Sequence, residues 1–174
     1  SVLAIGNFDG IHIGHKKVLK EAAKKAKKLK KKFGLLTFEP VPVMFFNKKI
    51  INHRIDSEHQ KILNLKREKI DFIIIQKFNK KFSNLSYQEF IYKILHKRIK
   101  CKYLYVSKNF KFGKKREGNI SKLKKYEKKF SFKTIITLPI TKKRRTVSST
   151  IIRKFLKRGE LQKANHLLDR KWEI

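Results

Sequence analysis

Residues 1–15 read SVLAIGNFDGIHIGH, a short apolar run followed by a loop rich in glycine and histidine. The run 1–6 predicts a buried strand, and residues 15–32, with apolar side chains at three- and four-residue steps between lysines, predict an amphipathic helix. Three glycines fall within the nine positions 6–14, so backbone amides of this loop can approach a ligand closely. A strand, a glycine-rich turn and a helix in this order favour phosphate binding at the helix N-terminus.

The rest of the chain continues the alternation of strands and helices. Apolar runs predict further strands at residues 33–38, 71–76, 102–107 and 132–138. Helical patterns follow at residues 57–69, 86–100, 119–129, 148–158 and 160–169. We therefore expect one domain over residues 1–174 with an α/β fold, a Rossmann-like doubly wound parallel sheet of about five strands. Such sheets bind ligands at the carboxyl ends of their strands, so the loops there are candidate sites.

The chain is strongly basic. Its 174 residues carry a formal net charge of +34, with 47 Lys and Arg against 13 Asp and Glu. Such a balance fits nucleic acid, an anionic membrane surface or polyphosphate ligands. The excess is mostly Lys and accompanies many Ile, Phe and Asn, a mixture that AT-rich codons produce. We expect non-specific binding of polyanions and no specific binding of nucleic acid.

The compartment is predicted from what the sequence contains. Cys101 is the single cysteine, so no internal disulfide forms and a reducing, cytoplasmic setting fits. The longest apolar runs are far too short to span a bilayer, and residues at the start lack the pattern of a signal peptide. Because the chain begins with Ser1 and its one methionine is Met44, we expect it to be a piece of a longer protein.

The loop 6–15 combines a phosphate cradle with two imidazoles. His12 and His15 are three residues apart and would share one face of the first helical turn. There they could stabilise the charge that develops during phosphoryl transfer. No third ligand is nearby, so a metal site is not predicted. The loop residues expected to surround a bound nucleotide are Gly6, Asn7, Phe8, Asp9, Gly10 and Gly14.

A second candidate phosphate site lies late in the chain, where residues 146–153 read TVSSTIIR. Hydroxyls of Ser148, Ser149 and Thr150 at a helix N-terminus can cap the helix and donate to an anion. Arg153 shares a face with Thr150, and its planar guanidinium suits a phosphate. An ordinary serine cap with a surface arginine is the alternative. The preceding cations Lys143, Arg144 and Arg145 either add to the field or are simply solvated.

These two segments together resemble the nucleotidylyltransferase superfamily, whose members carry His-x-Gly-His after the first strand and Ser-Ser-Thr-x-x-Arg later on. The longer string from Gly6 to His15 resembles more narrowly the adenylyltransferase domain of bacterial FAD synthetases. That resemblance implies transfer of AMP from ATP to FMN, with Mg²⁺ accompanying ATP. It also implies that His12 and His15 contact the ATP phosphates and that residues 148–153 hold the departing pyrophosphate.

Two middle segments extend the resemblance to the flavin side. Residues 37–46 read TFEPVPVMFF, and residues 109–113 read NFKFG. In the family, prolines and aromatic rings of the first segment line the flavin, and the polar residue that opens the second faces it. Flat rings and an amide suit an isoalloxazine, which needs stacking and edge hydrogen bonds. The implied flavin-binding residues are Phe38, Pro40, Pro42, Phe46 and Asn109.

The chain departs from the family pattern at Val41, Lys108, Ile151 and Asp169, and these departures bear on flavin affinity more than on ATP chemistry. Family members usually continue into a riboflavin kinase barrel, which implies a covalently linked kinase domain in the parent protein; residues 1–174 contain nothing of it. The alternatives are another small-molecule nucleotidylyltransferase, a degenerate enzyme, or a basic RNA-binding derivative of the fold.

Overall fold

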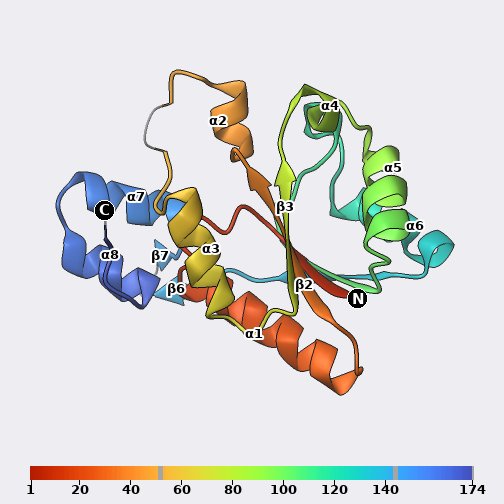
Figure 1. Ribbon diagram of the computed structural model, residues 1–174, viewed down its shortest axis with the longest axis horizontal. Coiled ribbons are helices and arrows are strands. Elements are labelled where there is room, and N and C mark those ends of the chain that lie inside the picture. Colours follow the sequence, from red (N-terminus) through yellow and green to blue (C-terminus); the bar gives the residue numbers. More distant parts are fainter. Residues whose placement is uncertain (51–52, 143–144, 174) are drawn as a thin grey trace.

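The computed structural model describes residues 1–50, 53–142 and 145–173 (Figure 1). Its central sheet has five parallel strands in the order β3-β2-β1-β4-β5. The strands are β1 (Val2–Ile5), β2 (Phe33–Glu39), β3 (Phe72–Lys77), β4 (Tyr103–Ser107) and β5 (Lys133–Thr137). The strand order reverses beside β1, which places a topological switch point at the end of β1. The predicted α/β class and parallel sheet are confirmed.

The helices cover both faces of this sheet. They are α1 (Ile13–Lys28), α2 (Pro42–Phe46), α3 (Glu58–Lys66), α4 (Lys80–Ser83), α5 (Tyr87–Glu89), the π-helical η1 (Phe90–Arg98), the 3₁₀ turn η2 (Lys114–Arg116), α6 (Ile120–Phe130), α7 (Ser149–Lys157) and α8 (Leu161–Leu168). In Figure 1, α1 and α3 lie on one side of the sheet, and α5 and α6 lie on the other. Helices α7 and α8 pack on each other beside the α1 side.

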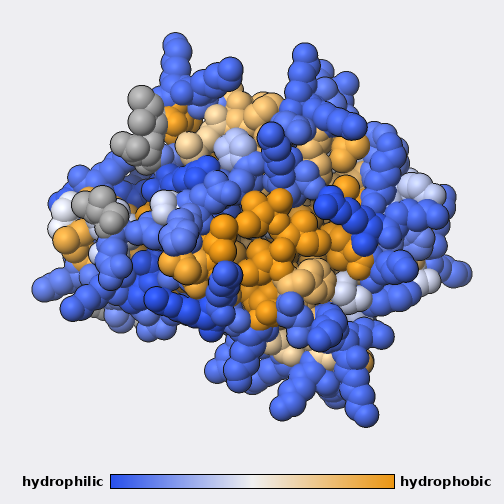
Figure 2. Space-filling view, viewed as in Figure 1, coloured by the Kyte–Doolittle hydropathy of each residue, from blue (hydrophilic) through white to orange (hydrophobic). Residues whose placement is uncertain are grey.

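The core follows from the two-residue period of the strands. Val2 and Ala4 of β1 pack toward α1, whereas Leu3 and Ile5 pack toward η1 and α6. All residues of β1 and β2 are buried, as expected for central strands with helices on both faces. The edge strand β3 is less covered: apolar surface gathers over it in Figure 2, and Ile75 is 37% exposed. A third apolar cluster joins α7 and α8 to the segment around Ile55.

Several boundaries differ from those expected. The first helix begins at Ile13 with His12 as its N-cap, two residues before the predicted start, because the His12 ring accepts the backbone N–H of His15. Residues 87–98 form the short α5 followed by η1, whereas one regular helix was expected over residues 86–100. The short helices α2 and α4 and the hairpin of β6 (Thr141–Lys142) and β7 (Arg145–Thr146) were not predicted, since elements this short carry no periodic pattern.

Candidate active site

A cleft of about 1090 Å³ runs along the carboxyl ends of β1, β2, β4 and β5, where a doubly wound sheet binds its ligands. Most of the predicted site residues line it: Gly6, Asn7, Phe8, His12, Gly14, His15, Phe38, Pro42, Phe46, Asn109, Ser148, Ser149 and Thr150. Asp9, Gly10, Pro40 and Arg153 stand outside this lining. The structure therefore brings the two predicted phosphate segments and the flavin segments to one cavity.

The two histidines form a stacked pair at the N-terminus of α1. Their ring centroids are 3.7 Å apart with an interplanar angle of 15°, and the His15 backbone N–H donates to His12 Nδ1 at 3.3 Å. Gly14 makes this arrangement possible, because a Cβ at that position would lie 3.0 Å from the His12 ring. Phe8 packs against the other member, with its ring centroid 5.1 Å from that of His15.

Both imidazoles are uncharged at neutral pH. Burial lowers the pKa of His12 to about 4. Burial also lowers the pKa of His15 well below its usual value, with smaller contributions from His12 and from the nearby cation Lys61. Since His12 Nδ1 accepts a hydrogen bond, the neutral ring carries its proton on Nε2. The pair is therefore set to donate neutral N–H groups, and approach of a polyanion would favour its protonation.

The N-terminus of α7 forms the facing wall. Ser148 is the N-cap, and its hydroxyl accepts the backbone N–H of Ile151 at 3.4 Å. Ser149 Oγ donates to the backbone oxygen of Asp9 at 2.8 Å, which ties this helix directly to the glycine-rich loop. The free amides at the starts of α1 and α7 thus border the same cleft, and both helix dipoles favour an anion there.

Asp9 and Arg153 form the second tie between loop and helix. Arg153 Nη1 lies 2.6 Å from Asp9 Oδ2, and Arg153 Nη2 donates to Thr150 Oγ1 at 3.3 Å. Asp9 Oδ1 also accepts the backbone N–H of Ile55 at 2.8 Å. Burial raises the pKa of Asp9, against the opposing effects of the Ile55 hydrogen bond and of Arg153. A direct phosphate contact by Arg153 would require this ion pair to open.

The opposite end of the cleft is aromatic. Phe38 and Pro42 line it, together with Phe46, which is 68% exposed. Two rings that sequence reasoning missed, Phe78 and Phe82, lie 6.0 and 5.9 Å from Phe38 between centroids. Their four-residue spacing just after a strand was the available signal. The exposed Asn109 lies at the same cleft, and Phe110 and Phe112 beyond it stack at 5.4 Å and 18°.

Sequence reasoning also missed a buried ionic cluster at the carboxyl end of β2. Glu39, at the end of β2, pairs with Lys61 Nζ at 3.0 Å and with Arg54 Nη2 at 2.6 Å. Lys61 is only 4% exposed, and burial lowers its pKa while Glu39 opposes the shift. Glu39 precedes Pro40 through a cis peptide bond. A lysine inside the helical stripe of α3 gave no indication that it would be buried, because its partner is distant in sequence.

The lining of the cleft is positively charged. Lys108, Lys111, Lys115 and Arg116 contribute to it, and no Asp or Glu does among the described residues. Within the described part of the chain no group of three or more His, Cys, Asp or Glu side chains could hold a metal ion. The predicted contribution of Lys143 and Arg144 lies outside the described residues.

A glycine-histidine loop after β1, a serine-capped helix facing it and the strand order 3-2-1-4-5 define a nucleotidylyltransferase-like α/β domain. A family model described as FAD synthetase matches residues 1–151. A crystal structure described as a macrolide-efflux protein from Streptococcus pneumoniae superposes with a TM-score of 0.85 over 99% of this chain and 57% of that one, at 28% identity. This likeness supports the assignment of the fold.

Curated relatives agree with the family model. A bifunctional riboflavin kinase/FMN adenylyltransferase from Buchnera aphidicola subsp. Schizaphis graminum is 40% identical over 100% of this chain and 56% of its own length. Its counterpart from Haemophilus influenzae is 35% identical over 99% of this chain and 56% of its own length. The chain belongs to the FAD synthetase family, which confirms the resemblance drawn from residues 6–15 and 146–153. It spans about half the length of these relatives.

No described helix combines the length and the apolar character needed to cross a lipid bilayer.

Proposed function

We propose that this domain transfers AMP from ATP to FMN, giving FAD and pyrophosphate. The supporting observation is the two-ended cleft: two helix N-termini with neutral imidazoles and hydroxyls at one end, and aromatic rings with an amide at the other. ATP phosphates suit the first end, because free amides and helix dipoles favour anions. An isoalloxazine suits the second end, because it offers a flat ring for stacking and edge atoms for hydrogen bonds.

The reaction is a direct in-line displacement. An FMN phosphate oxygen forms a new bond to the α-phosphorus of ATP, and the bond from that phosphorus to the β-phosphate oxygen breaks, so that pyrophosphate leaves with the bonding pair. Catalysis then consists of positioning and of stabilising charge at the phosphorus. His12 and His15 would donate to oxygens of the α-phosphate, which gain negative charge in the transition state. The hydroxyls of Ser148 and Thr150 would donate to the departing phosphates, whereas the Ser149 hydroxyl donates to the backbone oxygen of Asp9.

Arg153 acts indirectly, because it lies outside the cleft lining. Its bonds to Asp9 and Thr150 fix the loop and the α7 N-terminus relative to each other, and the bond from Ser149 to Asp9 adds to this. Correct spacing of the two phosphate-binding ends matters, because displacements near 1 Å can cost large factors in rate. Asp9 and Gly10 likewise fix the conformation of the loop. Gly10 has φ +82°, and a Cβ there would lie 2.9 Å from the Ile55 side chain.

Mg²⁺ would arrive with ATP as part of the substrate. The described cleft lining holds no carboxylate, and carboxylates are the protein ligands that Mg²⁺ usually takes. The residues present therefore do not form a protein-built magnesium site, and phosphate oxygens and water would hold the ion. The kinase activity named in the bifunctional relatives is assigned to the part of their length that this chain does not match.

The test is formation of FAD from FMN and Mg·ATP by this chain, followed by chromatography. Wild type should produce FAD, and His12→Ala and His15→Ala should each lower kcat on the order of a hundredfold, because one donor to the transition state is lost. Melting temperatures of the variants control for misfolding. Turnover of nicotinate mononucleotide or phosphopantetheine instead of FMN would reassign the acceptor. Absence of any adenylyl transfer, with RNA binding that persists at physiological salt, would replace the enzyme by a binding module.

A further inference from the structure

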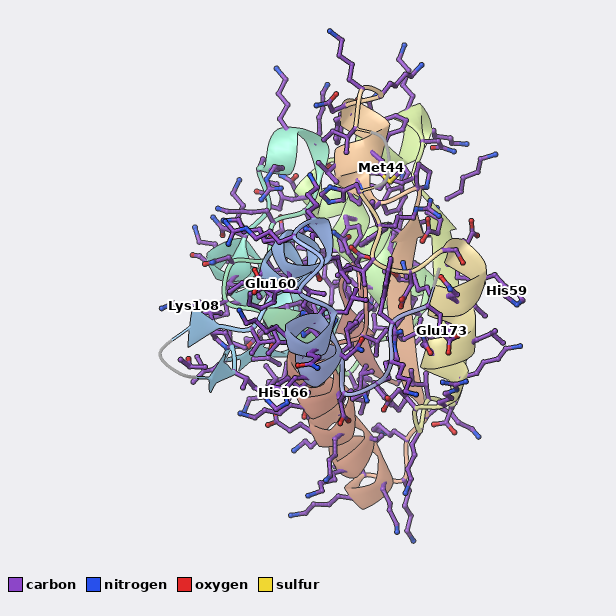
Figure 3. The ribbon with its side chains drawn as sticks, turned by 90° about the vertical axis from the view of Figure 1, so that its left-hand side faces the viewer. Met44, His59, Lys108, Glu160, His166 and Glu173 are labelled. Atoms are coloured by element: carbon purple, nitrogen blue, oxygen red, sulfur yellow. The ribbon has the colours of Figure 1, made fainter. Side chains whose placement is uncertain are left out.

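The segment 169–173, which follows α8, lies against two segments from the first third of the chain. Arg170 Nη2 donates to Gly10 O at 3.5 Å, and it also forms an ion pair with the carboxylate of Asp56. Figure 3 shows Glu173 beside α3, and its backbone oxygen accepts a hydrogen bond from a side chain of that helix. Contacts with residues 114 and 160 positions away therefore hold this segment in place.

The ion pair between Arg170 and Asp56 is largely removed from solvent. The two side chains are 19% and 1% exposed, and Asp56 Oδ2 also accepts from Asn64 Nδ2 at 3.2 Å. A carboxylate this deeply buried requires a cation and hydrogen-bond donors, because an uncompensated charge in the interior is costly. Arg170 is therefore fixed by its partner, and its second hydrogen bond reaches the glycine-rich loop.

Trp172 forms the second anchor of segment 169–173. Its indole N–H donates to Ile55 O at 2.8 Å, and its backbone N–H donates to Asn165 Oδ1 at 2.7 Å. The ring packs against the apolar cluster that joins Ile55 to α7 and α8. Because Ile55 is only 3% exposed, its carbonyl needs a partner inside the protein, and the indole provides it.

Ile55 joins these anchors to the loop that carries the histidines. Its backbone N–H donates to Asp9 Oδ1 at 2.8 Å, while its carbonyl accepts from Trp172. Asp9 is also the residue to which a hydroxyl and a guanidinium tie the N-terminal part of α7. The next residue, Gly10, accepts from Arg170. Two neighbouring residues of the loop are therefore held, directly or through one intermediate, by Arg170 and Trp172.

Neither Arg170 nor Trp172 lines the cleft, so any effect on the reaction must pass through the residues that they hold. We propose that both are positioning residues for adenylyl transfer, which fix the His12 loop relative to the N-terminus of α7 by holding Gly10 and Ile55. This inference rests on the proposed function, because it concerns the same reaction. Misplacement of reacting groups by about 1 Å can cost roughly a hundredfold in rate, so the loss of an anchor should be measurable.

The experiment measures kcat for FAD formation and two affinities, one for FMN and one for Mg²⁺ with α,β-methylene-ATP, whose α–β bridge cannot be cleaved. All measurements are made well below the melting temperature of each variant. Trp172→Phe keeps a ring in the apolar cluster and removes the indole N–H, so kcat and the affinity for the ATP analogue should each fall about three- to tenfold. Arg170→Met should lower both by about tenfold or more.

The affinity for FMN separates positioning from general loosening. It should stay within about twofold of wild type in both variants, because the aromatic end of the cleft lies on other elements. Arg170→Lys should recover part of kcat, since an ammonium can still pair with Asp56. Lys171→Met is the matched control: it removes an exposed cation from the neighbouring position, and it should leave kcat and both affinities unchanged.

Several results would overturn the assignment. A lower melting temperature in Arg170→Met and Trp172→Phe, with kcat and the affinity for the ATP analogue unchanged, would make both residues ordinary structural contacts. An equal loss in Lys171→Met would assign the effect to net charge, and an equal loss of FMN affinity would assign it to the whole domain. If Arg170→Met does not fold, Trp172→Phe and Arg170→Lys decide.

The two proposals fail in different ways. If wild type makes no FAD, the proposed function fails, and the affinity of the variants for the ATP analogue still tests whether segment 169–173 positions the phosphate-binding loop. If wild type makes FAD and the folded variants make it equally fast, only the positioning role of Arg170 and Trp172 fails.

Discussion

Replacing Arg153 by Met should destabilise the domain through Asp9. The Arg153 and Asp9 side chains are 19% and 9% exposed, and their charged atoms lie 2.6 Å apart. Met keeps much of the volume and removes the charge, so Asp9 is left as a buried carboxylate without its cation. Burial already raises the pKa of Asp9 with the arginine present, and its removal would raise that pKa further.

The expected loss of stability depends on which contacts of Asp9 remain after the arginine is removed. Breaking a fully buried pair costs about 3–5 kcal/mol. Asp9 keeps the hydrogen bond from Ile55 N–H at 2.8 Å, and Arg153 is partly solvated, so we expect a loss of about 2–3 kcal/mol in the free energy of unfolding. For a domain of this size that corresponds to a decrease in Tm of roughly 4–12 °C.

Urea unfolding followed by circular dichroism measures this effect. Asp9→Asn keeps an acceptor for Ile55 and loses the charge, so the double variant Asp9→Asn/Arg153→Met should lose at least about 1 kcal/mol less than the sum of the single losses. Arg158→Met is the control: Arg158 is 71% exposed and 4.0 Å from Glu160, so its loss should stay within about 0.5 kcal/mol of wild type. A similarly small effect of Arg153→Met, or strictly additive losses, would refute the argument.

Two further predictions concern His12 and the glycines. The pKa of His12 is about 4 in the folded chain and about 6.5 when unfolded, so the unfolded state takes the proton first. The free energy of unfolding should therefore decrease by up to about 3 kcal/mol from this group as pH falls from 6.5 to 4. His12→Asn, which retains an N-cap, should lose that part of the pH dependence in urea titrations; an unchanged slope would contradict it. Gly34→Ala should destabilise the domain by about 1–3 kcal/mol, because the new Cβ would lie 2.1 Å from the Phe72 ring, which must then move. Gly159→Ala, with φ +69° and open space, should cost only about 1 kcal/mol by thermal melting.

The sheet could be predicted because each strand has a local apolar pattern in the sequence. Apolar runs such as residues 102–107, separated by helical patterns, leave few arrangements other than a parallel sheet. The helix caps are equally local: Ser57 and Ser86 form capping boxes with Gln60 and Glu89, each three residues further on. The short strands β6 and β7 and the turn η2 were not predictable in the same way, because elements this short carry no periodic pattern. The turn η2 is also held by a distant segment, since Lys114 N–H donates to Leu85 O.

The residues of the candidate site also fall into those that the sequence could predict and those that it could not. His12, Gly14 and His15 could be chosen from the sequence, because their spacing and the adjoining strand and helix predict a phosphate-binding loop. Phe78 and Phe82 could not, because their membership of the aromatic end depends on where β3 ends relative to Phe38. The cations of η2 could not be chosen either, because the chain has 47 Lys and Arg residues and charge alone does not show which of them border the cleft.

The sequence by itself determined the class of fold, the family and the two candidate phosphate-binding segments, since each depends on residues that are neighbours along the chain. The tertiary structure alone decided what Asp9, Glu39 and Arg153 do. Asp9 and Arg153 are 144 residues apart and Glu39 and Lys61 are 22 apart, so only folding makes them ion pairs. Burial is likewise a tertiary property, and it is burial that leaves the two histidines uncharged beside a strongly basic surface.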